Sequence, residues 1–370
     1  MNKSYALGAV FVVAILLGAI GLVLMAPEKD TGEGITVVDM VGREVTVPEK
    51  VDRIVCIGAG SLRFITYLEG TDKVVGVEDH EVKTGPTDIG GRTYRAAHPE
   101  LAELPTIGPI HKGDDELIIK ANPQVIFKSS YEAGDCDDLQ NKLGIPVVAL
   151  TNQVDLGPNI ELFYKQIRLI GEVLDKDDRA EDLISNTKKT ITDLEDRVKD
   201  IPEAEKLRVY VGGISYSGAH GIDSTSCKYP PFDFLNANNV ITVGMMKNKT
   251  VGQIDIEILP ELNPQVMFID WGGYELCKND YVQYKASLDD IDAVKNGELY
   301  GVRQYNWYAT NYDSLLANCY YVGTVLFPEE FADVDPEQKT DEIYEFWVGA
   351  SIYDEVVKNC GGGFEKVSLA

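Results

Sequence analysis

Residues 116–127 read ELIIKANPQVIF, and the same pattern returns as EILPELNPQVMF at residues 257–268. Each copy is typical of a helix end, because the proline forces the preceding asparagine out of the α region. A short apolar strand follows at once. The copies lie 141 residues apart, whereas solenoid repeats recur every 20 to 50 residues or so. The pattern therefore predicts two α/β lobes of similar build.

The residues before the first copy have the features of an open α/β sheet. Residues 35–39 and 44–47 alternate about Val41-Gly42-Arg43, which predicts a β-hairpin. The apolar run at residues 54–57 predicts a strand covered on both faces. It leads into the turn Gly58-Ala59-Gly60-Ser61. Because ligands of such sheets bind beyond the carboxyl ends of the strands, this turn is a candidate ligand wall.

A helical region separates the two predicted lobes. Apolar side chains fall at helical spacing from Phe163 to Leu174, and a second helical pattern runs from about residue 178 to 199 after a charged break. At 1.5 Å per residue, that second helix would be about 33 Å long and would bridge two domains as one stiff element. We expect a first lobe at residues 31–157, a helical linker at 158–203 and a second lobe at 204–370, with small relative movements.

Composition restricts the possible partners. The chain carries 60 acidic and 34 basic side chains, a net charge of −26. Such a chain repels phosphate backbones, which argues against nucleic-acid binding. The six cysteines stand singly, which argues against a zinc ribbon or a thioredoxin-like site. Cys227 and Cys277 could form a disulfide in an oxidising compartment.

Residues 1–30 are predicted to be a membrane anchor or signal segment. The 21 residues 5–25 carry no charge, and a helix of that length spans the roughly 30 Å core of a bilayer. Lys3 precedes them and acidic residues follow, so the positive-inside rule places the remaining chain outside the cytoplasm. No clear cleavage site follows the apolar segment, and we expect an uncleaved anchor, with secretion as the alternative if it is cleaved.

Candidate ligand-binding residues come from both lobes. The long connection at residues 79–113 holds basic and aromatic side chains, and residues 304–312 hold four aromatic ones after a predicted strand. Basic groups would pair with anionic parts of a ligand, while aromatic rings would cover its apolar faces. No Gly-x-Ser-x-Gly elbow presents a nucleophile. The candidates are Ser61, Arg63, Arg92, Tyr94, Arg95, Lys112, Tyr216, His220, Trp271, Tyr305, Asn306 and Tyr308.

Several of these stretches resemble one family, the extracytoplasmic substrate-binding proteins of ABC importers for iron complexes and cobalamin. The resemblance begins with DMVGREVTVP at residues 39–48 and continues through residues 53–55, both Asn-Pro-Gln-Val elements, residues 168–171 and Tyr305-Asn306. It covers about residues 35–348. It implies two Rossmann-like lobes that are joined by one long helix, bind ligand between them and close little. No cysteine stands where a lipid would be attached, so the predicted anchor is the apolar helix.

The resemblance also implies how the protein meets its permease. In this family an acidic residue on the exposed top of each lobe docks onto basic residues of the membrane permease. Glu132 and Glu275 follow the two repeated patterns at matched positions and suit that role, and Glu257 is a rival for the second position.

The expected function is capture of a chelated metal, such as a ferric siderophore, haem or a corrinoid, for delivery to an ABC permease and its ATPase. We expect no enzymatic activity and no cofactor. One alternative is a binding protein for a bare divalent ion, held by some of His80, His98, His111 and His220, although their spacing matches no standard motif. Another is a chelatase-like enzyme or an oxidoreductase subunit on the same scaffold, because fold alone does not determine function.

Overall fold

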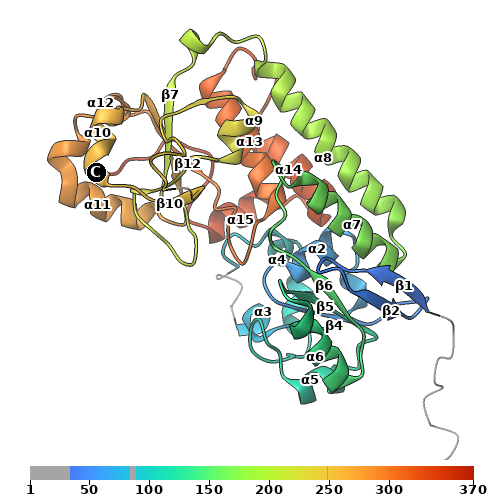
Figure 1. The fold of residues 1–370 in the computed structure, drawn as a ribbon. Coiled ribbons are helices and arrows are strands. Elements are labelled where there is room, and N and C mark those ends of the chain that lie inside the picture. The colour runs from blue at the N-terminus through green and yellow to red at the C-terminus, as the bar shows by residue number, and fades with distance from the viewer. Residues whose placement is uncertain (1–33, 84–88, 248) are drawn as a thin grey trace, which may run out of the picture.

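The computed structural model describes residues 34–83, 89–247 and 249–370. Figure 1 shows two lobes, with the long helix α8 (Asp177–Val198) running along one side of the molecule from the first lobe to the second. This agrees with the predicted α/β fold of two lobes and with the predicted interlobe helix. The predicted anchor at residues 5–25 lies outside the described residues. Within the described ranges, no helix has the length and apolar character needed to cross a membrane.

The first lobe is built on a parallel sheet with the strand order β4-β3-β5-β6. The predicted hairpin at residues 35–47 is confirmed as an antiparallel pair beside it. The strands are β1 (Ile35–Val38), β2 (Glu44–Val47), β3 (Ile54–Ile57), β4 (Val74–Gly76), β5 (Val125–Ser129) and β6 (Val147–Leu150). The helices are α2 (Ser61–Tyr67), α3 (Asp79–Lys83), α4 (Thr93–Ala97), α5 (Asp115–Ala121), α6 (Ala133–Leu143) and α7 (Ile160–Leu174).

The second lobe has a parallel sheet with the strand order β12-β11-β7-β9. When strands are numbered along the chain within each lobe, both sheets have the order 2-1-3-4, so the two lobes repeat one topology. The strands are β7 (Arg208–Gly212), β8 (Ser224–Ser226), β9 (Asn238–Asn239), β10 (Val251–Gln253), β11 (Val266–Asp270) and β12 (Leu299–Val302). The helices are α9 (Pro230–Phe234), α10 (Leu259–Leu262), α11 (Tyr274–Leu288), α12 (Asp292–Asn296), α13 (Tyr312–Leu326), α14 (Pro336–Val348) and α15 (Tyr353–Asn359).

The repeated pattern has the same role in both lobes. Asn122 and Asn263 end their helices in the left-handed conformation, with φ of 52° and 42°. The glutamine two residues later accepts backbone hydrogen bonds at the start of the neighbouring strand. Gln124 Oε1 accepts from Arg53 N at 3.0 Å, and Gln265 Oε1 accepts from Arg208 N at 3.1 Å. The pattern therefore joins a helix end to the first strand of each sheet.

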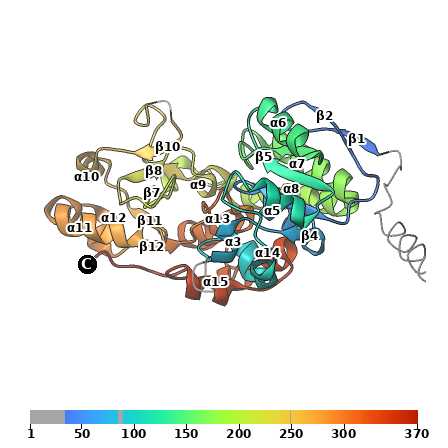
Figure 2. The same ribbon diagram turned by 90° about the horizontal axis from the view of Figure 1, so that it is seen from below.

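A continuous hydrophobic core connects the two lobes. One cluster of buried side chains contains residues of both lobes and of the linker. Tyr312 of α13 lies 5.7 Å from Phe64 of α2 and 4.9 Å from Phe163 of α7, between ring centroids. Trp347 of α14 packs edge-on against Tyr67, at 4.9 Å. Figure 2 shows α13 between the lobes and α14 and α15 beside the first lobe, so helices 312–359 contact both lobes.

Two segments of the second lobe differ from what their sequence predicts. The apolar run at residues 240–243 predicts a strand, but the strand of this region is the short β9 at Asn238–Asn239, and Val243 is half exposed. The polar stretch at residues 217–225 predicts an exposed loop, but Ser224–Ser226 form the buried strand β8. The six cysteines, all within the described residues, are free thiols, so Cys227 and Cys277 are not paired.

Candidate functional site

A cavity of about 530 Å³ lies between the two lobes, and we call it the interlobe cleft. Its walls are loops that follow β3 and β4 in the first lobe and β7 and β12 in the second. These are the carboxyl ends of parallel strands, where α/β folds bind ligands. The lining residues are Ala59, His80, His111, Ser215, Tyr216, Ser217, Gly218, Ala219, Gln304, Asn306, Trp307, Tyr308 and Ala309.

Tyr308 crosses the interlobe cleft from the second lobe to the first. Its ring lies beside two imidazoles, with centroids 4.9 Å from His80 and 5.4 Å from His111. Its hydroxyl donates to Glu78 Oε2 at 2.5 Å. Burial raises the pKa of the Tyr308 phenol, and the nearby Glu78 carboxylate raises it further. Tyr308 is thus a neutral aromatic group whose polar end is attached to the opposite lobe.

Glu78 is buried, with 4% of its surface exposed, and it organises the first-lobe wall. Its Oε1 accepts from Gly58 N at 3.1 Å and from His111 N at 2.6 Å. Burial raises the pKa of Glu78, while the hydrogen bonds from Tyr308, Gly58 and His111 oppose that shift. One carboxyl group therefore connects the turn after β3, the loop at His111 and the second lobe.

Arg63, a predicted ligand group, lies behind the cleft wall with 1% of its surface exposed. Its Nε donates to Asn311 Oδ1 at 2.8 Å, and its Nη2 donates to the carbonyls of Trp307 at 2.8 Å and Tyr308 at 3.0 Å. Its guanidinium therefore fixes the second-lobe segment that carries Tyr308. Ser61 is also buried, and its hydroxyl donates to Ile57 O at 2.9 Å.

The two arginines of the long connection point into the first lobe. Arg92 and Arg95 form buried ion pairs with Glu81 at 2.9 and 3.0 Å, and the Tyr94 hydroxyl donates to the same carboxylate at 2.6 Å. A buried carboxylate is costly unless charged and polar groups compensate it. These three candidates are thus engaged in the interior and are not among the residues that line the interlobe cleft.

Four other candidates lie outside the interlobe cleft. Lys112 is exposed and lines a different cavity, of about 430 Å³, next to α6. Trp271 donates from Nε1 to Gly363 O at 2.8 Å, which directs its indole to the C-terminal segment. Tyr305 is buried against Tyr229. His220 stacks on Tyr216 at 4.2 Å and lines a neighbouring cavity.

The structure brings Tyr216, Asn306 and Tyr308 together among the predicted residues. Asn306 Nδ2 donates to Ser215 O at 2.6 Å, which joins the loops after β7 and β12. The first-lobe contributors His80 and His111 are not among the predicted ligand-binding residues, although both belong to the long connection at residues 79–113 and to the alternative of a bare-ion site. Their sequence positions could have predicted this role, because His80 follows β4, His111 precedes α5, and such segments meet at the ligand-binding edge of the sheet.

The four histidines do not converge. His80 and His111 line the interlobe cleft, whereas His98 Nε2 is bonded to Val348 O at 3.0 Å and His220 Nε2 donates to Tyr216 O at 2.8 Å. Across the described ranges, no group of three or more His, Cys, Asp or Glu side chains is arranged to hold a metal ion.

The two glutamates expected to meet the permease occupy matched positions. Glu132 directly precedes α6, which follows β5, and Glu275 lies in the first turn of α11, which follows β11. Both side chains are exposed. Glu275 pairs with Lys278 of the same helix at 2.6 Å, a surface contact worth little free energy.

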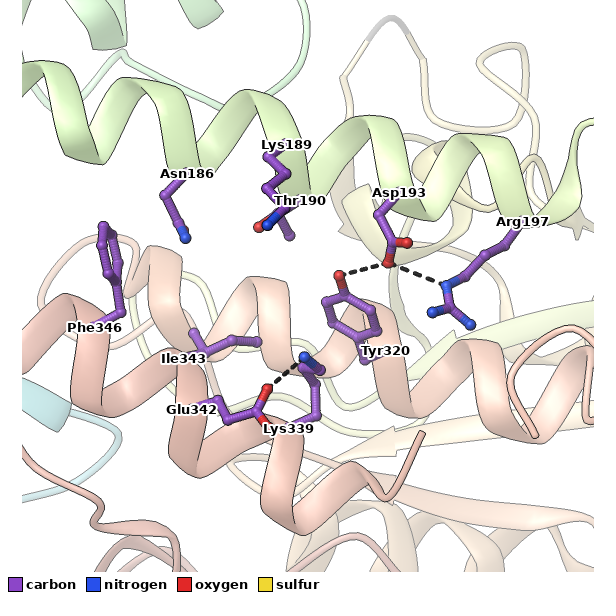
Figure 3. A pocket seen from close by; sticks show the side chains of 10 residues that line it. All are labelled: Asn186, Lys189, Thr190, Asp193, Arg197, Tyr320, Lys339, Glu342, Ile343 and Phe346. Carbon is purple, nitrogen blue, oxygen red and sulfur yellow. Dashed lines mark hydrogen bonds and ion pairs between the residues drawn. The ribbon is translucent and has the colours of Figure 1, made fainter. Parts of the chain in front are cut away.

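Another hollow, of about 360 Å³, lies between α8, α13 and α14. Figure 3 shows that several of its charged groups are paired, with Asp193 accepting from Tyr320 and Arg197, and with Glu342 contacting Lys339. All of its lining residues belong to these three helices, away from the carboxyl ends of the strands. The interlobe cleft is therefore the better candidate for the ligand site.

Comparison with known proteins bears on the family and the fold of the chain. Residues 54–305 match the family described as "Periplasmic binding protein", and this range includes both sheets and most of the cleft lining. The molybdate-binding protein MolA of Haemophilus influenzae is 23% identical over 326 residues, which are 84% of this chain and 89% of MolA. The petrobactin-binding protein YclQ of Bacillus subtilis is 24% identical over 325 residues, 83% of this chain and 93% of YclQ.

Solved structures show the same fold. The structure of MolA bound to molybdate superposes with a TM-score of 0.66 at 20% identity and covers 86% of this chain and 98% of MolA. A periplasmic solute binding protein from Veillonella parvula superposes with a TM-score of 0.69 at 19% identity, covering 88% and 96% of the two chains. At these identities the likeness supports the architecture alone.

Proposed function

The chain belongs to the periplasmic binding protein family, as the substrate-binding component of an ABC transporter, and from that premise we propose that its cargo is a chelated metal. A ferric siderophore, haem or a corrinoid would bind between the lobes and pass to the permease of the importer. Family members act outside the cytoplasm. We further propose that residues 5–25, outside the described ranges, anchor the chain to the cell membrane.

The composition of the interlobe cleft is the observation that supports this cargo. Its described lining contains the aromatic side chains of Tyr216, Trp307 and Tyr308 and the imidazoles of His80 and His111, but no lysine or arginine. The rings of Tyr216 and Trp307 would cover the apolar faces of a flat or bulky chelate. The volume of about 530 Å³ lies within the range of pockets for small organic ligands, roughly 300–1,000 Å³.

The same composition argues against two simpler cargoes. A free oxyanion such as molybdate, which MolA binds, would be favoured by lysine or arginine side chains, and the described lining contains neither. A bare divalent ion would need three or four converging ligands, and His80 and His111 are the two histidines present. The relatives named above are binding proteins, and we propose no catalytic role.

A tryptophan-fluorescence titration would test the cargo. Haem, cobalamin and ferric petrobactin would be titrated into the purified protein, with molybdate and Zn²⁺ in parallel. We expect saturable quenching by one chelate, because Trp307 lines the cleft. The Trp307→Phe variant should lose most of the quenching, whereas Trp271→Phe should keep it, since that indole faces the C-terminal segment. Binding of molybdate or Zn²⁺ alone would contradict the proposal.

The docking of the permease is a separate part of the proposal. We expect the Glu132→Lys/Glu275→Lys double variant to bind cargo normally but to lose transport, because each exposed carboxylate would meet a basic group of the permease. Cargo affinity and uptake into cells would be measured side by side. Glu257→Lys is the matched control on the second lobe. Loss of uptake in that variant, with normal uptake in Glu275→Lys, would transfer the role to Glu257.

A further inference from the structure

Cargo has to reach the interlobe cleft without a large movement of the lobes. The buried rings of Phe64, Phe163, Tyr312 and Trp347 form one core across the lobe boundary. A wide hinge opening would expose these rings to water and would lose their burial free energy. A local movement inside the cleft would therefore admit cargo at a lower free-energy cost than a hinge opening.

The segment that carries Tyr308 is held in an unusual backbone conformation. Tyr308 and Ala309 have φ of 51° and 67°, a left-handed region that residues other than glycine seldom adopt. Arg63 of the first lobe binds the carbonyls of Trp307 and Tyr308. The close approach of Trp307 to Gly90 adds a second attachment, because a Cβ atom at Gly90 would lie 2.4 Å from Trp307 Cε2. These contacts aim the Tyr308 side chain across the cleft.

The Tyr308 ring is partly exposed: it lines the interlobe cleft on one side and a small hollow beside Glu78 and Tyr94 on the other. Its hydroxyl donates to Glu78, and its ring lies next to the imidazoles of His80 and His111. Side-chain rotation needs no change at the attached backbone. The ring can therefore leave its position once the bond to Glu78 is broken.

We propose that the Tyr308 ring is a gate of the interlobe cleft: it fills the space beside His80 and His111, Glu78 holds it there, and incoming cargo swings it aside. The inference deepens the proposed function, on which its cargo step rests, because it names a residue that controls entry and selects cargo able to replace the ring. The alternative, in which Tyr308 is a fixed surface that cargo stacks on, makes opposite predictions for its variants.

The first test needs no cargo. The rate at which diethyl pyrocarbonate modifies His80 and His111 would be followed by mass spectrometry, with His98 as internal reference. Tyr308→Phe keeps the ring but removes the bond to Glu78, and we expect modification of the partly buried His80 to rise several-fold, to at most about tenfold, toward the rate in Tyr308→Ala, while the already exposed His111 changes less. Tyr281→Phe is the matched control, since it removes a 2.6 Å phenol–carboxylate bond to Asp289 away from the cleft.

The second test follows binding of ferric petrobactin, haem and cobalamin by stopped-flow fluorescence. The gate predicts faster association in Tyr308→Phe and in Tyr308→Ala, without weaker binding. Unchanged histidine modification in Tyr308→Phe would overturn the gate whatever the cargo, and so would weaker binding of a chelate by Tyr308→Ala. If modification rises but no chelate binds, the proposed function fails while the gate stands as a property of the fold.

Discussion

Asp270 is a buried carboxyl group at the end of β11 with 1% of its surface exposed. Burial raises its pKa to about 8, and the hydrogen bond from Gly272 N, at 2.8 Å, and the charge of Arg303 only partly oppose that shift. The folded protein therefore holds this proton more tightly than the unfolded chain does. The resulting stability is fully present below the unfolded pKa, near 4, and is lost as the pH rises through about 8.

This loss of stability with rising pH leads to a prediction for Asp270→Asn. The amide keeps the acceptor for Gly272 N but cannot ionise, so the free energy of unfolding should lose one pH-dependent contribution of up to about 1.4 kcal/mol per pH unit between pH 5 and 7. Urea unfolding of both proteins at pH 5, 6 and 7 would measure it. Asp290→Asn, at an exposed carboxylate, is the control. Equal pH dependence in the wild type and Asp270→Asn would contradict the prediction.

At the scale of elements, the repeated helix-to-strand junction has unequal strength in the two lobes. Gln124 Oε1 accepts from Asp52 N at 2.8 Å and from Arg53 N at 3.0 Å, and Gln124 Nε2 donates to Lys50 O at 3.0 Å. The side chain of Gln265 accepts one such hydrogen bond, from Arg208 N at 3.1 Å. Gln124 therefore makes more hydrogen bonds than Gln265 does to the backbone at the start of the neighbouring strand.

We expect Gln124→Ala to lower the free energy of unfolding by about 1–2 kcal/mol and Gln265→Ala by about half as much, because a hydrogen bond contributes roughly 0.5–1.5 kcal/mol net of its exchange with water and Gln124 makes more of them. Chemical denaturation would measure both. Gln283→Ala, at an exposed position of α11, should change stability by less than about 0.5 kcal/mol. A larger effect of Gln265→Ala than of Gln124→Ala would show that the number of these hydrogen bonds does not set the contribution of each junction to stability.

At the scale of the whole molecule, the shared aromatic core couples the two lobes. Tyr312 and Trp347 are buried against first-lobe and linker residues, although they follow the second sheet in sequence. Separate domains with small polar interfaces unfold independently, whereas a continuous apolar core favours a joint transition.

We therefore expect thermal unfolding in a single transition that coincides in far-ultraviolet circular dichroism and in tryptophan emission. Tyr312→Ala should uncouple the lobes and broaden or split that transition, because it leaves a cavity between α2, α7 and α13. Tyr281→Ala, in the core of the second lobe, should lower the midpoint without splitting it. Two separate transitions in the wild-type protein would contradict this expectation.

The sequence by itself determined the duplicated architecture, because the signals for it are local. The Asn-Pro-Gln pattern, the apolar runs of the central strands and the helical spacing between the lobes each specify backbone within a few residues. The interlobe helix was predicted within one or two residues of α8. The aromatic stretch that contains Asn306 and Tyr308 was likewise recognised from its position after a strand.

Only the tertiary structure decided which side chains face the interlobe cleft. Arg92 and Arg95 looked available for an anionic ligand, but Glu81 binds both in the interior. Arg63 meets its partners about 245 positions away in the chain. No spacing rule predicts such pairs, because a charged group goes to whatever partner the fold brings close and buries with it. For the same reason, the position of Tyr308 beside His80 and His111 is evident only once both sheets are assembled.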